Sequence, residues 1–208
     1  MSIKHRIKNP ILRTKMERST GVLWEMALPA PSADTYLNSI ALGVGGLTIA
    51  SGDWTSRTPV IPMVPVFTVT EAVTDSWTAV SISLTGRDQF GEIKTETITC
   101  TNASGTWTGT ALNAYLRFDS SVITVTGTSS AADSVTVGFA QTVGLGVEIG
   151  KTDDILIATF DGYGYGTAQV AGWEAGTANL GPSTYTIHPA KTPNGTLVAR
   201  FFIKPSMG

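Results

Sequence analysis

"SLTGRDQFGEIKTETIT", which spans Ser83–Thr99, is the stretch that decides the fold class. The alternation begins just before this stretch, where the apolar residues Val80, Ile82 and Leu84 are separated by small polar residues. This is the pattern of a strand with one buried face. Gly86–Gly91 then supplies turn residues, and alternating β-forming residues follow it. The stretch therefore predicts a β-hairpin. It contains no motif of a nucleophile, a metal site or a phosphate-binding loop.

Nine short runs of the chain show strand patterns between turn residues. They are residues 66–70, 78–85, 92–101, 114–118, 121–127, 134–139, 154–160, 184–188 and 196–204. No segment of ten residues shows a firm helical pattern. Nine short strands without such a helix predict an all-β fold, namely an antiparallel β-sandwich, with a jelly-roll arrangement as one option.

Residues 1–65 differ from the rest of the chain. They contain six of its ten prolines and little sustained alternation. Because proline removes a hydrogen-bond donor and restricts the residue before it, we expect an extended, Pro-rich N-terminal arm with loops over residues 1–65. Residues 66–208 are expected to form the β-sandwich body. Apolar residues around Trp24 give the arm side chains that can dock on another surface.

The composition predicts a surface with few charges. Charged residues make up 14% of the chain, below the roughly 25% of ordinary soluble domains, while threonine occurs 31 times. Low charge and abundant threonine predict strand faces that carry hydroxyl groups rather than lysine and glutamate. Such a surface costs little to desolvate, so it suits permanent contact with other subunits. An extracellular β-domain is the alternative that composition leaves open.

The charged side chains are distributed unevenly. Residues 1–18 carry six basic residues and one acidic residue, a net charge of +5, whereas the other 190 residues carry eight basic and fifteen acidic residues, a net charge of −7. A basic arm predicts contact with an acidic partner, such as the body of another copy. Because no aromatic residues interleave with the charges to stack on bases, we expect protein rather than nucleic acid as the partner. The candidate contact residues of the arm are Lys4, Arg6, Lys8, Arg13, Lys15, Arg18 and Trp24.

A glycine-rich segment with aromatic residues interrupts the strand pattern between Phe160 and Ser183. Its aromatic residues Tyr163, Tyr165 and Trp173 are the second group of candidate contact residues. Aromatic side chains in a flexible loop can stack on sugars or insert into a partner protein. The alternative is that these aromatic side chains pack under the protein's own sheet.

The sequence shows no constellation for catalysis, for a cofactor or for a metal. The only histidines, His5 and His188, lie far apart in the sequence. Asp153 and Asp154 are adjacent, so their side chains would face opposite sides of a strand. We therefore expect no enzymatic activity and no cofactor. A glycosidase with scattered carboxylates is the remote alternative.

The sequence also bears on the compartment. No continuous apolar segment follows the positive charges of the N-terminus, so we do not expect a signal peptide. The most apolar stretch, Ile40–Ala50, is too short to span a bilayer, and we expect a soluble protein without a membrane partner. Cys100 is the only cysteine, so it cannot form an intrachain disulfide. We expect it to be a small buried hydrophobe in a protein assembled in a reducing cytoplasm.

Parts of the sequence resemble a pattern found in structural proteins of tailed bacteriophages. In Ala79–Ser120 a strand ends in Thr-Gly-x-Asp-x-Phe-Gly and a strand of the Glu-Thr-Ile type returns. In Ser134–Ile149 a Thr-Val-Gly-Phe run leads to Gly-Leu, and Pro193–Pro205 is similar to the closing turn and strand of such proteins. The matching residues are Thr85, Gly86, Asp88, Phe90, Gly91, Glu96, Thr97, Ile98, Thr136, Val137, Gly138, Phe139, Gly144 and Leu145.

The resemblance implies a virion protein that decorates or cements the capsid and is assembled in the cytoplasm of the bacterial host. It brings no catalytic residues. Its partners would be the major capsid protein and copies of itself, in a homo-oligomer for which a trimer is the first expectation. Two alternatives stay open: a structural protein of the tail or of the head–tail joint, and a carbohydrate-binding β-sandwich that uses the aromatic loop.

Overall fold

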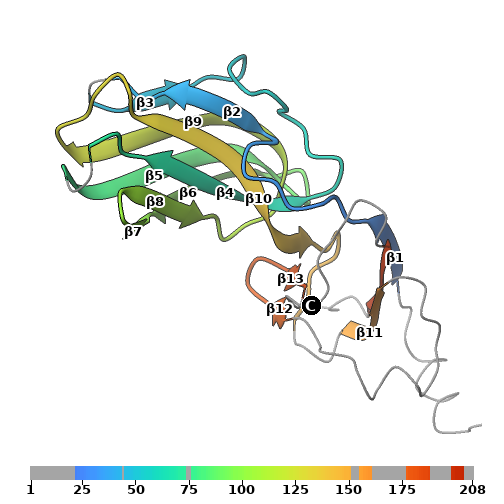
Figure 1. Cartoon of the computed structure of the whole chain (residues 1–208). Helices are drawn as coiled ribbons and strands as arrows, with labels where there is room; N and C mark the ends of the chain where they lie inside the picture. Colours follow the sequence, from blue (N-terminus) through green and yellow to red (C-terminus); the bar gives the residue numbers. More distant parts are fainter. Residues whose placement is uncertain are drawn as a thin grey trace, which may run out of the picture.

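The computed structural model describes residues 22–43, 45–73, 76–150, 155–160, 177–187 and 198–203. Every helix or strand element within these residues is a β-strand, and paired strands run antiparallel (Figure 1). The all-β, antiparallel part of the fold prediction is therefore confirmed. Within the same residues, no helix is long and apolar enough to cross a membrane.

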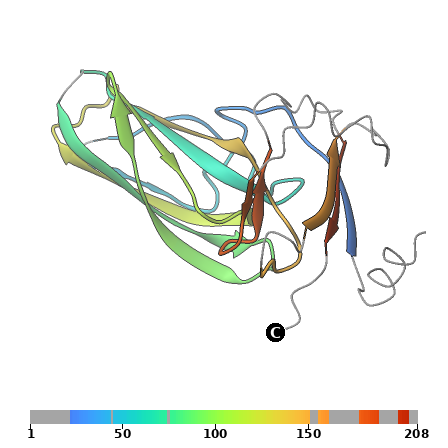
Figure 2. The ribbon, with the colours of Figure 1, turned by 90° about the horizontal axis from the view of Figure 1, so that it is seen from below.

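The main sheet contains eleven of the described strands and is strongly curled into a half-barrel (Figure 2). Its hydrogen-bonded order is β12-β13-β10-β4-β9-β5-β6, with β2 on β10, β3 on β9, β8 on β4 and β7 on β8. The strands are β2 (Leu37–Ala41), β3 (Leu47–Ile49), β4 (Met63–Thr70), β5 (Trp77–Asp88), β6 (Ile93–Thr99), β7 (Thr101–Ala103), β8 (Thr106–Thr110), β9 (Tyr115–Gly127), β10 (Ser134–Gly144), β12 (Thr177–Asn179) and β13 (Thr184–Thr186).

A second sheet of three strands, in the order β1-β14-β11, lies beside the main sheet. Its strands are β1 (Val22–Ala27), β11 (Ile155–Phe160) and β14 (Val198–Ile203). It joins the two ends of the described chain, because Val22 pairs with Ile203. Tyr185 of β13 and Phe201 of β14 link the two sheets, with their ring centroids 5.0 Å apart.

Strands β5 and β6 form the hairpin that the sequence predicts, with Ser83 opposite Thr97. The turn is held by Asp88, whose Oδ1 accepts the backbone N–H groups of Phe90 and Glu92, both at 2.9 Å. This is how a short acidic side chain stabilises a turn. The hairpin is therefore fixed by its own turn chemistry as well as by its alternation.

The core lies inside the curl of the main sheet. Val80, Ile82 and Leu84 of β5 are buried, as their alternation predicts. Strand β8 approaches β6 so closely that a Cβ on Gly109 would lie 2.8 Å from Cγ2 of Ile98. The glycine thus lets β8 pack against β6. Cys100 is buried as expected, and burial raises the pKa of its thiol to about 11.

The described residues before residue 65 differ from the expected extended arm with loops. They form β1, β2, β3 and the start of β4, and the expected domain boundary at residues 65 and 66 falls inside β4. The rings of Tyr36 and Trp54 lie 4.9 Å from the ring of Phe118 on β9. A Cβ on Gly138 of β10 would collide with the carbonyl oxygen of Ser32. This segment therefore packs on the chain's own body.

Proline frequency gave the wrong expectation for this segment because most of its prolines lie in the connections, while the strands between them are short. Two other strand expectations also differ. Residues 114–118 and 121–127 join into the single strand β9. Strand β8, Thr-Trp-Thr-Gly-Thr, is not among the predicted strands, and its glycine permits the close approach to β6.

Candidate functional site

Three neighbouring strands present an exposed face that carries hydroxyl groups and no charge. We call it the hydroxyl face. Its residues are Ser81, Ser83 and Thr85 on β5, Thr95, Thr97 and Thr99 on β6, and Ser120, Val122 and Thr124 on β9. The register places them in three rows across the strands, and Oγ1 of Thr85 lies 2.9 Å from Oγ1 of Thr95.

The hydroxyl face lies on the side of β5 opposite its buried residues. Eight of its nine positions carry a hydroxyl group, and Val122, which is 43% exposed, fills the ninth. All nine positions are partly or fully exposed. Because the face carries no ionised group, covering it with another protein involves no burial of charge, which is the expensive part of desolvation. The arrangement suits a permanent contact.

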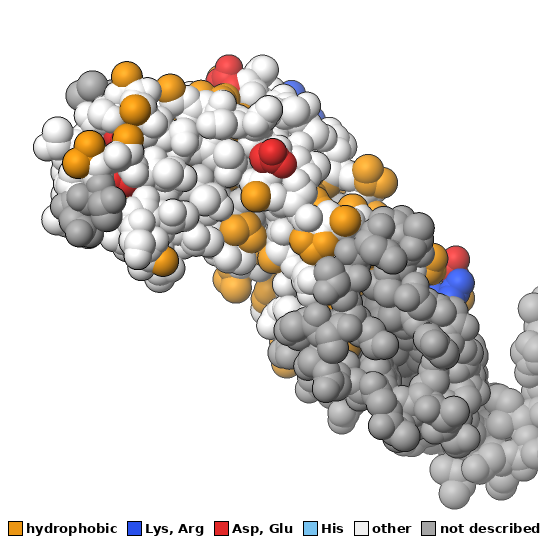
Figure 3. Space-filling view, in the orientation of Figure 1, with side chains coloured by type: hydrophobic (Ala, Val, Ile, Leu, Met, Phe, Trp, Pro, Cys, Tyr) orange, Lys and Arg blue, Asp and Glu red, His pale blue; other side chains and the backbone are white. Residues whose placement is uncertain are grey.

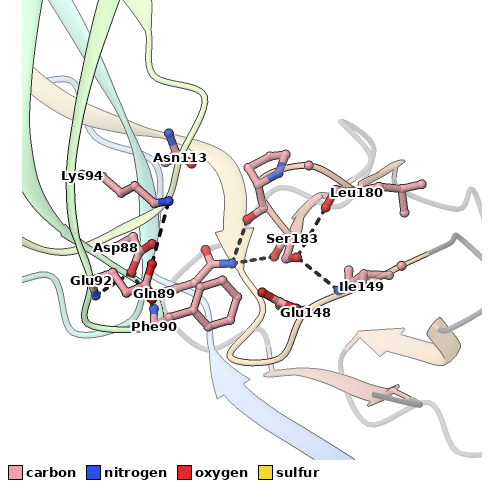
Figure 4. Close-up of a pocket in the computed structure, with 13 residues that line it drawn as sticks. Asp88, Gln89, Phe90, Glu92, Lys94, Asn113, Glu148, Ile149, Leu180 and Ser183 are labelled. Atoms are coloured by element: carbon pink, nitrogen blue, oxygen red, sulfur yellow. Dashed lines mark hydrogen bonds and ion pairs between the residues drawn. The ribbon is translucent and has the colours of Figure 1, made fainter. Parts of the chain in front are cut away.

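A pocket of about 290 Å³ lies between the β5–β6 turn and the β12–β13 turn (Figure 4). Its ionisable side chains are Asp88, Glu92, Lys94 and Glu148. The Asp88 carboxylate already accepts the two turn N–H groups, while Glu92 and Glu148 are exposed. The Lys94 Nζ lies 3.9 Å from a Glu92 carboxylate oxygen, which makes a weak, solvent-screened pair. The pocket is therefore acidic.

The two walls of the pocket are tied together by side chains. Gln89 donates from Nε2 to the carbonyl oxygens of Pro182 at 2.8 Å and Ser183 at 2.9 Å. The Oγ of Ser183 accepts the backbone N–H of Ile149 at 3.1 Å and donates to the carbonyl oxygen of Leu180 at 3.4 Å. Figure 4 shows these bonds, which connect the two walls of the pocket.

Two apolar side chains line the pocket, Phe90 and Leu180, and we call them the pocket rim. Their exposed fractions are 42% and 39%, in that order. Ile93 and Leu112 are also exposed but do not line the pocket. On the face shown in Figure 3, hydrophobic side chains gather on the main sheet beside the grey atoms. A rim of this kind indicates a contact surface.

Glu96 holds the backbone of Leu112, the residue before the pocket-lining Asn113. Its Oε2 accepts the backbone N–H of Leu112 at 2.9 Å and its Oε1 accepts the hydroxyl of Tyr115 at 2.8 Å. Burial, followed by the charge of Glu96, raises the pKa of Tyr115 well above its usual range. The tyrosine therefore stays a neutral donor and holds Glu96 in place.

The lining of the pocket supplies groups that can bind a partner. Among the described residues, no group of three or more His, Cys, Asp or Glu side chains could hold a metal ion. The carboxylate of Asp88 is occupied by the turn, and Glu92 faces solvent next to Lys94. What the pocket offers is negative charge, carbonyl and amide groups, and an apolar border.

Most of the residues that the sequence singled out lie outside the described residues. These are Lys4, Arg6, Lys8, Arg13, Lys15, Arg18, Tyr163, Tyr165 and Trp173. Trp24 lies in β1, where its backbone pairs with Phe201 of β14. The hydroxyl face and the pocket were not predicted as sites. The alternation of Ser and Thr was the sequence signal that could have indicated the hydroxyl face. The pocket lies between turns about ninety residues apart in the sequence, so no local pattern indicates it.

Comparisons of the chain with protein-family models, with curated proteins and with solved structures find no match.

Proposed function

We propose that the chain is a non-enzymatic structural protein of a tailed-phage virion, which decorates or cements the capsid through subunit contacts. The hydroxyl face is the observation that carries the proposal. It is an ordered, uncharged and exposed surface on three hydrogen-bonded strands. An enzyme needs side chains that move protons or bind reacting groups, whereas a subunit contact needs a stiff surface that is cheap to desolvate.

The rest of the described surface supports the same role. Charged side chains are sparse on the face shown in Figure 3, in keeping with the low charge of the whole chain. The pocket rim adds exposed apolar area at one end of the main sheet. The partners in this proposal are the major capsid protein and further copies of the chain, arranged as a homo-oligomer with a trimer as the first expectation.

In this proposal the body works as a β-sandwich, with the jelly roll as one arrangement. The arm predicted for residues 1–65 is restricted to residues 1–21, because the residues from Val22 onward form strands β1 to β4. Residues 1–18 carry a net charge of +5. A tethered basic segment binds an acidic neighbour at high effective concentration. It would therefore strengthen subunit contacts that are individually weak.

Replacing Thr97 with lysine tests the proposal. Thr97 lies in the middle row of the hydroxyl face. An ammonium group there would be buried without a partner in the contact, so we expect occupancy on purified particles to fall about tenfold or more. Thr108→Lys is the matched control, because Thr108 is an exposed strand threonine on β8, outside the face. Equal occupancy for Thr97→Lys and the control would refute the role of the face.

A further inference from the structure

The pocket between the β5–β6 and β12–β13 turns has a lining that fits a basic and partly apolar occupant. Three of its four ionised side chains are carboxylates, so they give it a net charge of −2. Two of the carboxylates, Glu92 and Glu148, are exposed and available to a partner. The pocket rim, Phe90 and Leu180, adds apolar side chains beside this charge. A charged pocket with an apolar border favours a segment in which cationic and aliphatic residues alternate.

The chain itself contains such a segment. Residues 1–18 carry the net charge of +5, and aliphatic residues lie between the basic ones. These aliphatic residues are Ile3, Ile7, Ile11, Leu12 and Met16. The first 21 residues precede β1, and a fully extended segment of that length spans about 70 Å. This length exceeds the roughly 30 Å diameter of a small domain.

We propose that the pocket and its rim bind residues 1–18 of a second copy of the chain. The inference rests on the proposed function, because it names the surface that receives the arm. The pocket walls are already joined through Gln89 and Ser183, so little ordering is needed when the segment binds. Each copy then gives one segment and receives one. Such head-to-tail contacts close into a ring when the rotation between copies allows it.

A charge-swap experiment on the full chain tests this docking. The pocket variant carries Glu92→Lys and Glu148→Lys, and the arm variant carries Lys4→Glu, Lys8→Glu and Lys15→Glu. We expect each variant alone to self-associate about tenfold more weakly than the wild type in sedimentation equilibrium. A mixture of the two variants should associate again. The basic arm of the pocket variant can bind the acidic pocket of the arm variant, and the acidic arm of the arm variant can bind the basic pocket of the pocket variant. Added salt should weaken every one of these contacts.

Asp34→Lys is the matched control, since Asp34 is an exposed carboxylate that does not line the pocket. It should change self-association by no more than about twofold. Near-ultraviolet spectra and thermal unfolding of each variant confirm that the exposed substitutions leave the fold intact.

Three outcomes would overturn the docking: a monomeric wild type, a pocket variant that associates like the wild type, and a mixture that does not regain association. A monomer for all chains, with the segment protected from protease, would mean docking within one chain. Occupancy on purified particles is measured separately. If the wild type occupies particles but the mixed variants do not regain self-association, only the docking is wrong. If the mixed variants regain self-association but particles lack the chain, only the virion role is wrong.

Discussion

Replacing Phe118 with alanine is expected to lower the free energy of unfolding by about 3–5 kcal/mol. Phe118 is fully buried, and its ring packs against Tyr36 and Trp54 at 4.9 Å and against Tyr115 at 5.9 Å. Alanine would leave a cavity between β9 and the segment before residue 65, because rings held by the sheet cannot all move to fill it. Chemical denaturation monitored by tryptophan fluorescence measures the loss.

The matched control is Phe90→Ala, in a side chain that is 42% exposed on the pocket rim. It should change the free energy of unfolding by no more than about 0.5 kcal/mol. If Phe118→Ala cost as little as this control, the segment that contains Tyr36 and Trp54 would not be packed on the body. The described N-terminal segment would then be an arm after all.

Replacing Glu71 with alanine is expected to cost about 3 kcal/mol or more, because several buried donors lose their acceptor. Glu71 is 5% exposed. Its carboxylate accepts the backbone N–H of Trp77 at 2.9 Å, the indole N–H of Trp107 at 3.3 Å, and both the backbone N–H and the hydroxyl of Ser76. It thereby ties the start of β5 to β8. Glu71→Gln, which keeps one acceptor oxygen, should cost less, and equal costs would contradict the hydrogen-bond explanation.

Two buried carboxylates, Glu71 and Asp133, make the free energy of unfolding depend on pH. Burial alone would raise the pKa of Glu71, but the hydrogen bonds from Ser76, Trp107 and Trp77 outweigh it and hold the pKa below the ordinary value of 4.5. Asp133 behaves likewise: bonds from Ala72 and Ser130 outweigh burial and hold its pKa below 3.8. A carboxyl with a lowered folded-state pKa stabilises the protein above its unfolded-state pKa, and this stability is lost as pH falls through the folded-state value.

We therefore expect the free energy of unfolding of the wild type to be level above about pH 5 and to fall steadily below it. Glu71→Gln should show a shallower decline, because its side chain does not titrate. Denaturation midpoints measured across the acid range test this expectation. Parallel curves for the two proteins would mean that Glu71 does not contribute to the acid sensitivity.

Local chemistry made the hairpin predictable from the sequence. Val80, Ile82 and Leu84 alternate with polar residues, and Asp88 provides the turn. The short strands β2 and β3 were not predictable, because their five and three residues give too little alternation. They are held by pairing with β10 and β9, which lie far along the chain. Tertiary contacts, rather than local preference, make them strands.

The candidate surfaces follow the same rule. The alternation of hydroxyl residues in β5 and β6 is visible in the sequence, but β9 joins the hydroxyl face only because it pairs with β5 on its other side. The pocket depends on Gln89 reaching Pro182, a contact between residues 93 positions apart. No local pattern encodes such a contact, so the acidic pocket emerges only from the folded chain.

The most direct test of the proposed function is to count copies of the chain on purified virions and to locate them by labelled-particle imaging. We expect many copies, spread over the shell in a fixed ratio to the major capsid protein. Absence of the chain from the virion, or confinement of all copies to a single ring at the neck or tail, would contradict the proposal that it decorates or cements the capsid.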